Sequence, residues 1–211
     1  MHAMIRRSAQ LFVLLLLLGG CRTTADPDAE NRQVFNWRLR ATEVDRGRLR
    51  GWRDAFVEGL REARGAGNSA EIEREGVLLD PDAALAQPQI PAGRYACRTI
   101  KLGRRDPTGL AYVSYPRFEC EVIVEAGVVR FVKRTGSQRP HGILYDDTPR
   151  RMIFIGTLLL GDEARPLDYS FDRERDMIGL LERIGDSRWR LVLPRPNFES
   201  DLDVIELVPN P

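Results

Sequence analysis

The sequence predicts a mainly β protein (α+β) with an N-terminal helical segment. About eight antiparallel strands should form a small up-and-down barrel covered by a helix. Two periodicities predict this fold. Apolar residues recur at helical spacing as far as about residue 75, and from about residue 93 they alternate with polar residues as in half-buried strands. Turn residues separate the strands, and closure into a barrel removes the edges that an open sheet would expose.

The first twenty-one residues have the pattern of a bacterial secretory signal that ends at a cysteine. Two arginines precede the apolar run of residues 11–18, which is far shorter than the roughly 20 residues that span a bilayer. A buried core helix is the alternative, but the run lacks an amphipathic stripe. The segment Leu18-Gly19-Gly20-Cys21 resembles the lipobox of bacterial lipoproteins. We therefore expect cleavage before Cys21, acylation of its thiol and stable membrane anchoring by the acyl chains.

Arg22 follows this cysteine, whereas the inner-membrane retention signal of the best-known sorting systems is an aspartate. By that resemblance we expect the chain on the periplasmic face of the outer membrane. The predicted organisation is a signal peptide at 1–20 and a lipidated tether at 21–36 that reaches roughly 20 Å. A helical segment with a Pro-containing connection at 37–92 and a barrel-like domain at 93–211 follow.

Charge and composition exclude a general attraction to polyanions. Loss of the two signal arginines reduces 32 basic residues to 30 against 31 acidic ones, a net charge of minus one. Such a chain has no field that gathers nucleic acid, so we expect no nucleic-acid partner. Only Lys101 and Lys133 among the basic residues are lysines. The codon bias of a GC-rich genome explains this better than phosphate binding, because the arginines are scattered among acids.

The helical segment begins at a predicted cap, Thr42 with Asp45 three residues later. Apolar side chains then share one helix face, and we expect this face to pack on the barrel rather than line a ligand site: Leu49, Trp52, Phe56, Leu60 and Ala63. Gly65 and Gly67 end the helix. A second short helix should run from Asn68 or Ser69 to Glu75.

Residues of the first two predicted strands alternate clearly. Tyr95, Cys97 and Thr99 form one inward set, and Phe118, Cys120, Val122 and Val124 form the next. Further strands are expected at 128–134, 142–145, 152–160, 177–184, 189–193 and 202–208, with a loop at 136–140 among the turns. The strand at 152–160 is apolar on both faces, which predicts that a helix covers its outer face.

Cys97 and Cys120 remain as a pair once Cys21 is acylated. In an oxidising compartment this is the number that one disulfide needs. Both fall on the inward sets of their strands, and the bridge would contribute on the order of 3 kcal/mol in the loop-entropy model. Free or catalytic thiols are the alternative, but a CxxC spacing and an obvious histidine partner are missing.

Several segments resemble the bacterial family called domain of unknown function 4893. They are Tyr95-Ala96-Cys97-Arg98-Thr99-Ile100-Lys101-Leu102-Gly103, Thr135-Gly136-Ser137-Gln138-Arg139-Pro140 and Arg188-Trp189-Arg190-Leu191-Val192-Leu193-Pro194. The similarity runs from about Ala41 to Pro209. It implies a recurring architecture and carries no activity, substrate or catalytic residue.

Motifs for catalysis or metal binding are weak. His2 leaves with the signal, so His141 is the single histidine of the mature chain, and we expect no metal site and no cofactor. Ser137, His141 and Asp146 have the residue types of a hydrolase triad, but no nucleophile elbow surrounds them. We therefore assign no catalytic residue. A pair of carboxylates for glycoside cleavage remains an alternative.

The polar segment from Lys133 to His141 is the candidate binding loop. It gathers cations and hydrogen-bond donors between two strands: Lys133, Arg134, Ser137, Gln138, Arg139 and His141. Cations in such a loop suit an acidic or carboxylate-bearing partner. The alternative is a plain turn, with Gly136 and Pro140 as turn residues.

Two functions follow from these observations. The first is a non-enzymatic module that binds a small apolar ligand or docks on an envelope protein while the lipid at Cys21 holds it to the membrane. Small barrels of this kind resemble lipocalins, which is an analogy of fold alone. The second is a hydrolase of envelope material with a carboxylate-based site that the sequence does not locate.

Overall fold

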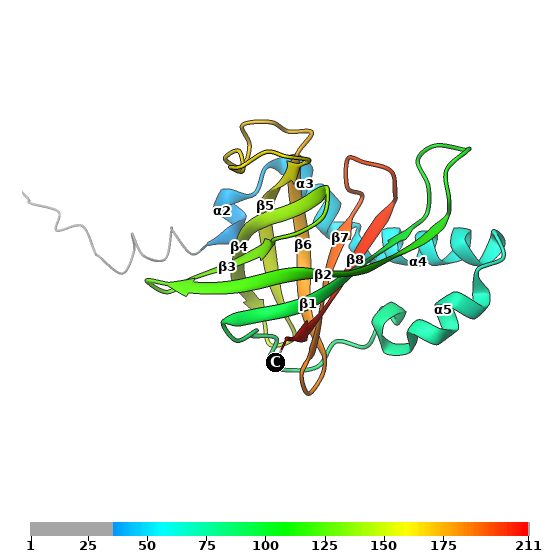
Figure 1. Ribbon diagram of the computed structural model, residues 1–211, viewed down its shortest axis with the longest axis horizontal. Coiled ribbons are helices and arrows are strands. Elements are labelled where there is room, and N and C mark those ends of the chain that lie inside the picture. The colour runs from blue at the N-terminus through cyan, green and yellow to red at the C-terminus, as the bar shows by residue number, and fades with distance from the viewer. Residues whose placement is uncertain (1–35, 211) are drawn as a thin grey trace, which may run out of the picture.

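A closed barrel of eight antiparallel strands forms the centre of the computed structural model, which describes residues 36–210 (Figure 1). Each strand pairs with its neighbour in the chain, and β1 pairs with β8 to close the barrel. The strands are β1 (Gly93–Leu102), β2 (Tyr112–Glu125), β3 (Val128–Lys133), β4 (Gln138–Thr148), β5 (Arg151–Leu160), β6 (Asp176–Gly185), β7 (Arg188–Pro194) and β8 (Leu202–Pro209). The predicted fold class is confirmed. The predicted signal, Cys21 and most of the tether lie outside the described residues.

The helices precede the barrel as predicted, but the long one is divided. They are α2 (Trp37–Arg40), α3 (Glu43–Arg50), α4 (Trp52–Gly65), α5 (Ser69–Glu75) and the 3-10 turn η1 (Gly76–Leu79). Thr42 caps α3 by accepting a hydrogen bond from the Asp45 amide at 3.2 Å, as predicted. Gly51 separates α3 from α4. None of the helices described is long and apolar enough to cross a membrane.

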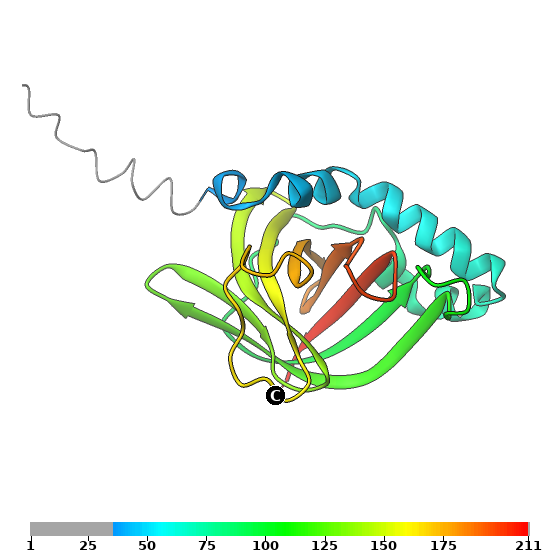
Figure 2. The same ribbon diagram turned by 90° about the horizontal axis from the view of Figure 1, so that it is seen from above.

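The helices lie along one side of the barrel, as the view from above shows (Figure 2). Phe56 of α4 is fully buried there, whereas Trp52, predicted to be part of the core, is only partly buried at its edge. Gly59 allows close packing, because a Cβ at this position would lie 3.0 Å from the Leu102 Cβ of β1. Outward residues of β5 join the cluster through Ile153 and Ile155, so the outer face of β5 is covered as predicted.

Apolar side chains fill much of the barrel interior. Phe131 and Phe154 meet edge to face at 5.9 Å, and Phe154 occupies space that Gly142 and Gly156 leave free on the paired strands β4 and β5. The predicted disulfide joins Cys97 of β1 to Cys120 of β2 in this interior, with Cα atoms 5.8 Å apart. The barrel is therefore a packed core over most of its length.

The two ends of the barrel differ. At one end tight turns connect the strands, and the segment before β1 closes the opening: Ile90 is buried in the interior cluster, and the Trp189 Nε1 donates to the Pro88 carbonyl at 3.2 Å. At the other end the connections are longer. Two of them, residues 161–175 and 195–201, are drawn at the top of Figure 1 and are called the mouth loops below. This longer-loop end is therefore the more open one.

Candidate functional site

A pocket of about 110 Å³ lies at this mouth of the barrel. Inward residues of the strands form its floor and the mouth loops form part of its rim. Its apolar walls include Phe118, Leu158, Met177, Phe198 and Ile205, and its polar lining includes Thr99, Lys101, Lys133, Ser137, Gln138, Asn197, Glu199 and Asp203. The site is concave and combines apolar walls with convergent polar groups, as small-molecule sites do.

The floor holds three ionisable side chains that are almost completely removed from solvent. Lys101 of β1, Lys133 of β3 and Asp203 of β8 are 5%, 6% and 6% exposed. Lys101 and Asp203 are direct cross-strand partners, and the Lys101 Nζ lies 3.1 Å from the nearer carboxylate oxygen. Glu199 adds a second carboxylate 3.4 Å from the same ammonium. Lys101 is thus a well-compensated buried cation.

Lys133 has a different environment. Its Nζ donates to the Gln138 carbonyl at 2.8 Å and lies 3.8 Å from the centre of the Phe118 ring. The ion pairs found in residues 36–210 include none of Lys133 with a carboxylate. A buried cation without a counterion is costly, so its presence marks a candidate for function.

The two lysines consequently differ in proton affinity. Burial lowers the pKa of Lys133 to about 8, and the positive charge of Lys101 adds to the effect. Burial also disfavours the charged form of Lys101, but the attraction of Asp203 and Glu199 outweighs it and raises the pKa of this lysine. Near neutral pH the pocket therefore contains one firmly protonated amine and one that readily loses its proton.

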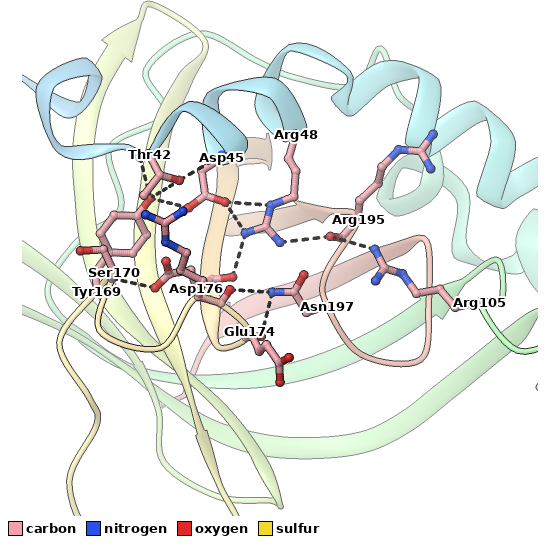
Figure 3. Close-up of polar contacts among 11 residues, drawn as sticks. Thr42, Asp45, Arg48, Arg105, Tyr169, Ser170, Glu174, Asp176, Arg195 and Asn197 are labelled. Atoms are coloured by element: carbon pink, nitrogen blue, oxygen red, sulfur yellow. Dashed lines mark hydrogen bonds and ion pairs between the residues drawn. The ribbon is translucent and has the colours of Figure 1, made fainter.

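Helix α3 fixes the mouth loops through Arg48, as the close-up shows (Figure 3). The Arg48 guanidinium donates to the Asp176 carbonyl at 2.8 Å and to the Arg195 carbonyl at 3.1 Å. Asp45, which is 1% exposed, orients this guanidinium by accepting from its Nε at 2.8 Å. The Tyr169 hydroxyl donates to the other Asp45 oxygen. The helical segment therefore positions the rim of the pocket.

Asn197 joins the two mouth loops directly. Its side-chain amide donates to the Arg173 carbonyl at 3.0 Å and to the Glu174 carbonyl at 2.7 Å (Figure 3). Next to this link, the Asp176 carboxylate accepts from the Ser170 amide at 2.7 Å, and burial raises the pKa of Asp176. Asn197, Glu174 and Asp176 all line the pocket, so the same contacts that join the loops shape the site.

One protein-family model matches nearly the whole of the described chain. The family model described as a domain of unknown function, DUF4893, matches residues 37–207. The chain belongs to this family. No curated protein and no solved structure matches it. The match begins at α2 and ends in β8, so the helical segment and the barrel are parts of one DUF4893 domain.

Within this DUF4893 domain the predicted binding loop is divided between pocket and outer surface. The turn comprises only residues 134–137, because β4 begins at Gln138, so the predicted loop at 136–140 is wrong in its second half. Lys133, Ser137 and Gln138 line the pocket. Arg134 instead forms an exposed ion pair with Glu121.

Arg139 and His141 also lie away from the pocket lining. Arg139 is half-buried, and its guanidinium donates to the Gly161 and Glu163 carbonyls, both at 2.8 Å. The Arg139 guanidinium is therefore bonded within the chain. His141 points to the other face of β4, where burial lowers its pKa together with the charges of Arg134 and Arg130.

The residues of the weighed hydrolase triad are not brought together. His141 and Asp146 are five residues apart on β4, which corresponds to about 16 Å and to opposite faces of a strand. The Asp146 carboxylate accepts instead from Gln89 at 3.2 Å. In residues 36–210 no group of three or more histidine, cysteine or acidic side chains could hold a metal ion.

The sequence interpretation missed Lys101 and Asp203 as site residues. The signal was present in the strand pattern, since Lys101 continues the inward series of Cys97 and Thr99. Lys133 likewise follows Phe131 at strand spacing. Lys101 and Lys133 are also the two lysines of the chain, so the scarcity of lysine singles out the same two positions.

Proposed function

We propose that this protein is a lipid-anchored, non-enzymatic envelope protein that binds a small amphipathic molecule in the mouth of its barrel. One observation carries the proposal: Lys133 lies in the pocket with a single carbonyl acceptor and an aromatic ring, beside the apolar side chains of the wall. A ligand with an oxygen acceptor at one end and an apolar body would satisfy both features.

The energetics favour such a ligand. A buried ammonium has lost most of its hydration, and a negatively polarised oxygen restores part of it, since hydrogen bonds to a charged group contribute about 1.5–3 kcal/mol. Phe118, Leu158, Met177 and Phe198 can cover the apolar part. At about 110 Å³ the pocket is smaller than the roughly 300–1,000 Å³ of drug-sized sites, so the ligand is small or inserts only one end.

Native mass spectrometry of the full chain, extracted in mild detergent from its own cells, tests the binding proposal. Wild-type protein should carry a bound small molecule that Lys133→Met loses. Arg134→Ala is the matched control, because Arg134 is the next residue but is ion-paired with Glu121 on the outer surface. Equal retention of the molecule by Lys133→Met and wild type would contradict the role of Lys133.

The anchor is tested separately. The resemblance of residues 18–21 to a lipobox supports acylation of Cys21. Cys21→Ser should stop incorporation of labelled palmitate and release the protein from the membrane fraction or leave it as an uncleaved precursor. Continued labelling of this variant would show that the lipid is elsewhere.

A further inference from the structure

The two lysines of the chain occupy one pocket. All other basic residues are arginines, many of them in exposed ion pairs such as those of Arg53 and Arg134. Lysine differs from arginine in one chemical respect that matters inside a protein: its amine can lose a proton and act as a nucleophile, whereas a guanidinium stays charged. The pocket is therefore the one place in the described chain where amine chemistry is available.

Lys133 is the reactive member of the pair. It has no carboxylate partner in the described structure, only the Gln138 carbonyl and the face of Phe118. Its pKa of about 8 leaves about a quarter of the molecules with a free amine at pH 7.5, against about a thousandth for an ordinary lysine. A desolvated lysine beside a second cation is a known way to activate an amine for imine formation.

Lys101 is suited to the complementary role. Asp203 and Glu199 hold its proton, so it remains a cation in the pocket that Lys133 also lines. A carbonyl oxygen that receives electron density during addition would lie in the field of this ammonium, which stabilises the developing charge. Lys101 would act as a positioning and electrostatic residue and would form no bond to the ligand.

We propose that Lys133 captures a small aldehyde or ketone with an apolar body as a reversible imine. This inference rests on the proposed binding function and names the ligand class. The free amine nitrogen adds to the carbonyl carbon while the carbonyl electron pair moves to oxygen. A proton passes from nitrogen to that oxygen, and the resulting carbinolamine loses its hydroxyl and the second nitrogen proton as water. One amine and one carbonyl compound give an imine and water, without an oxidant or reductant.

Reductive trapping tests the proposal. The full chain in mild detergent is incubated with butanal and cyanoborohydride near pH 7.5, and peptide mapping measures the adduct at each lysine. Lys133 should be labelled faster than Lys101 by at least about two hundredfold, following the difference in free amine, and its labelling should saturate with butanal concentration. Equal rates at the two lysines, or a rate that rises linearly without saturation, would overturn the proposal.

Butanoate separates this inference from the binding function. It has a similar apolar chain but cannot form an imine, so it should bind and slow the labelling of Lys133. Saturation-transfer NMR measures butanoate binding to wild type directly, and Lys133→Met, which has no amine, should lose the adduct. If butanoate binds wild type but no butanal adduct forms, the imine proposal fails and the binding function stands. If neither probe binds, both fail.

Discussion

Burial of Lys133 should make the stability of the protein rise with pH. The pKa of this lysine is lowered from its ordinary 10.5 to about 8, chiefly by burial. In the unfolded chain the amine returns to its ordinary value. Between these two values the unfolded state therefore binds more protons than the folded state, and the free energy of unfolding increases with pH. At 1.36 kcal/mol per pKa unit, the buried charge costs about 3 kcal/mol below this window.

Lys133→Met isolates the effect, because methionine has a similar apolar stem and does not titrate. Urea unfolding of both proteins should be followed from about pH 7 to about pH 9.5. The stability of wild type relative to the variant should rise by about 2 kcal/mol over this range, which is most of the full cost. Tyr112 and Tyr169, whose pKa values burial raises to about 12, are present in both proteins and cancel in the difference.

A difference that stays constant over this range would show that the Lys133 amine is hydrated in the folded state. That result would remove the basis for both binding and imine formation at this residue. Arg134→Ala is again the control. Arg134 lies outside the pocket in an exposed ion pair with Glu121, so the difference of this variant from wild type should not change with pH.

Three further changes test the framework of the fold. Arg190 of β7 and Glu182 of β6 form a fully buried ion pair, and Arg190→Met should cost about 3–5 kcal/mol in urea unfolding, since it leaves the buried Glu182 with only Arg151 at 3.6 Å; the additional change Glu182→Leu should recover much of the loss. Arg48→Ala should increase amide hydrogen exchange in the mouth loops more than in the barrel strands, because the guanidinium donates to the Arg195 carbonyl in one loop and to the Asp176 carbonyl where the other loop enters β6. Reduction of the Cys97–Cys120 bridge should lower the free energy of unfolding by about 3 kcal/mol, measured against the oxidised chain.

Much of the fold could be predicted because strand signals are local. The first strands show their buried face by period-two alternation, the later ones are continuous apolar runs, and the tight turns carry glycine or proline. The division of the long helix was missed because a glycine inside a helix costs only about 1 kcal/mol and often does not interrupt it. At Gly51 the chain changes direction between α3, which contacts the mouth loops, and α4, which packs on β1. Only tertiary contacts decide whether a helix continues through such a glycine or is divided at it.

The boundary of the predicted binding loop failed for a specific reason. Pro140 was taken as a turn residue, since proline lacks the amide donor of a regular strand. In the barrel, pairing of β4 with β3 ends at His141, so Pro140 has a partner only on β5, in Leu158. The missing donor therefore breaks no pair with β3. A sequence pattern cannot reveal this, because it depends on where the neighbouring strand stops.

The pocket itself depends on closure of the barrel. Lys101, Lys133 and Asp203 come from β1, β3 and β8, and the pairing of β1 with β8 brings the first and last strands together. Alternation alone shows that each side chain faces inward. It does not show that all three lie near the same end, or that the other end is closed by the segment before β1.

Codon bias and a functional pocket are complementary explanations of the scarce lysine. A genome that favours arginine replaces lysine wherever only a positive charge is needed, as in exposed ion pairs. It cannot do so without cost where the side chain is enclosed, because a guanidinium has five donors that all need partners and cannot give up its charge. Lys101 has two carboxylates and Lys133 has one carbonyl as acceptors. At Lys133 in particular an arginine would leave most of its donors unpaired, so the same bias that removed lysine elsewhere makes this position informative.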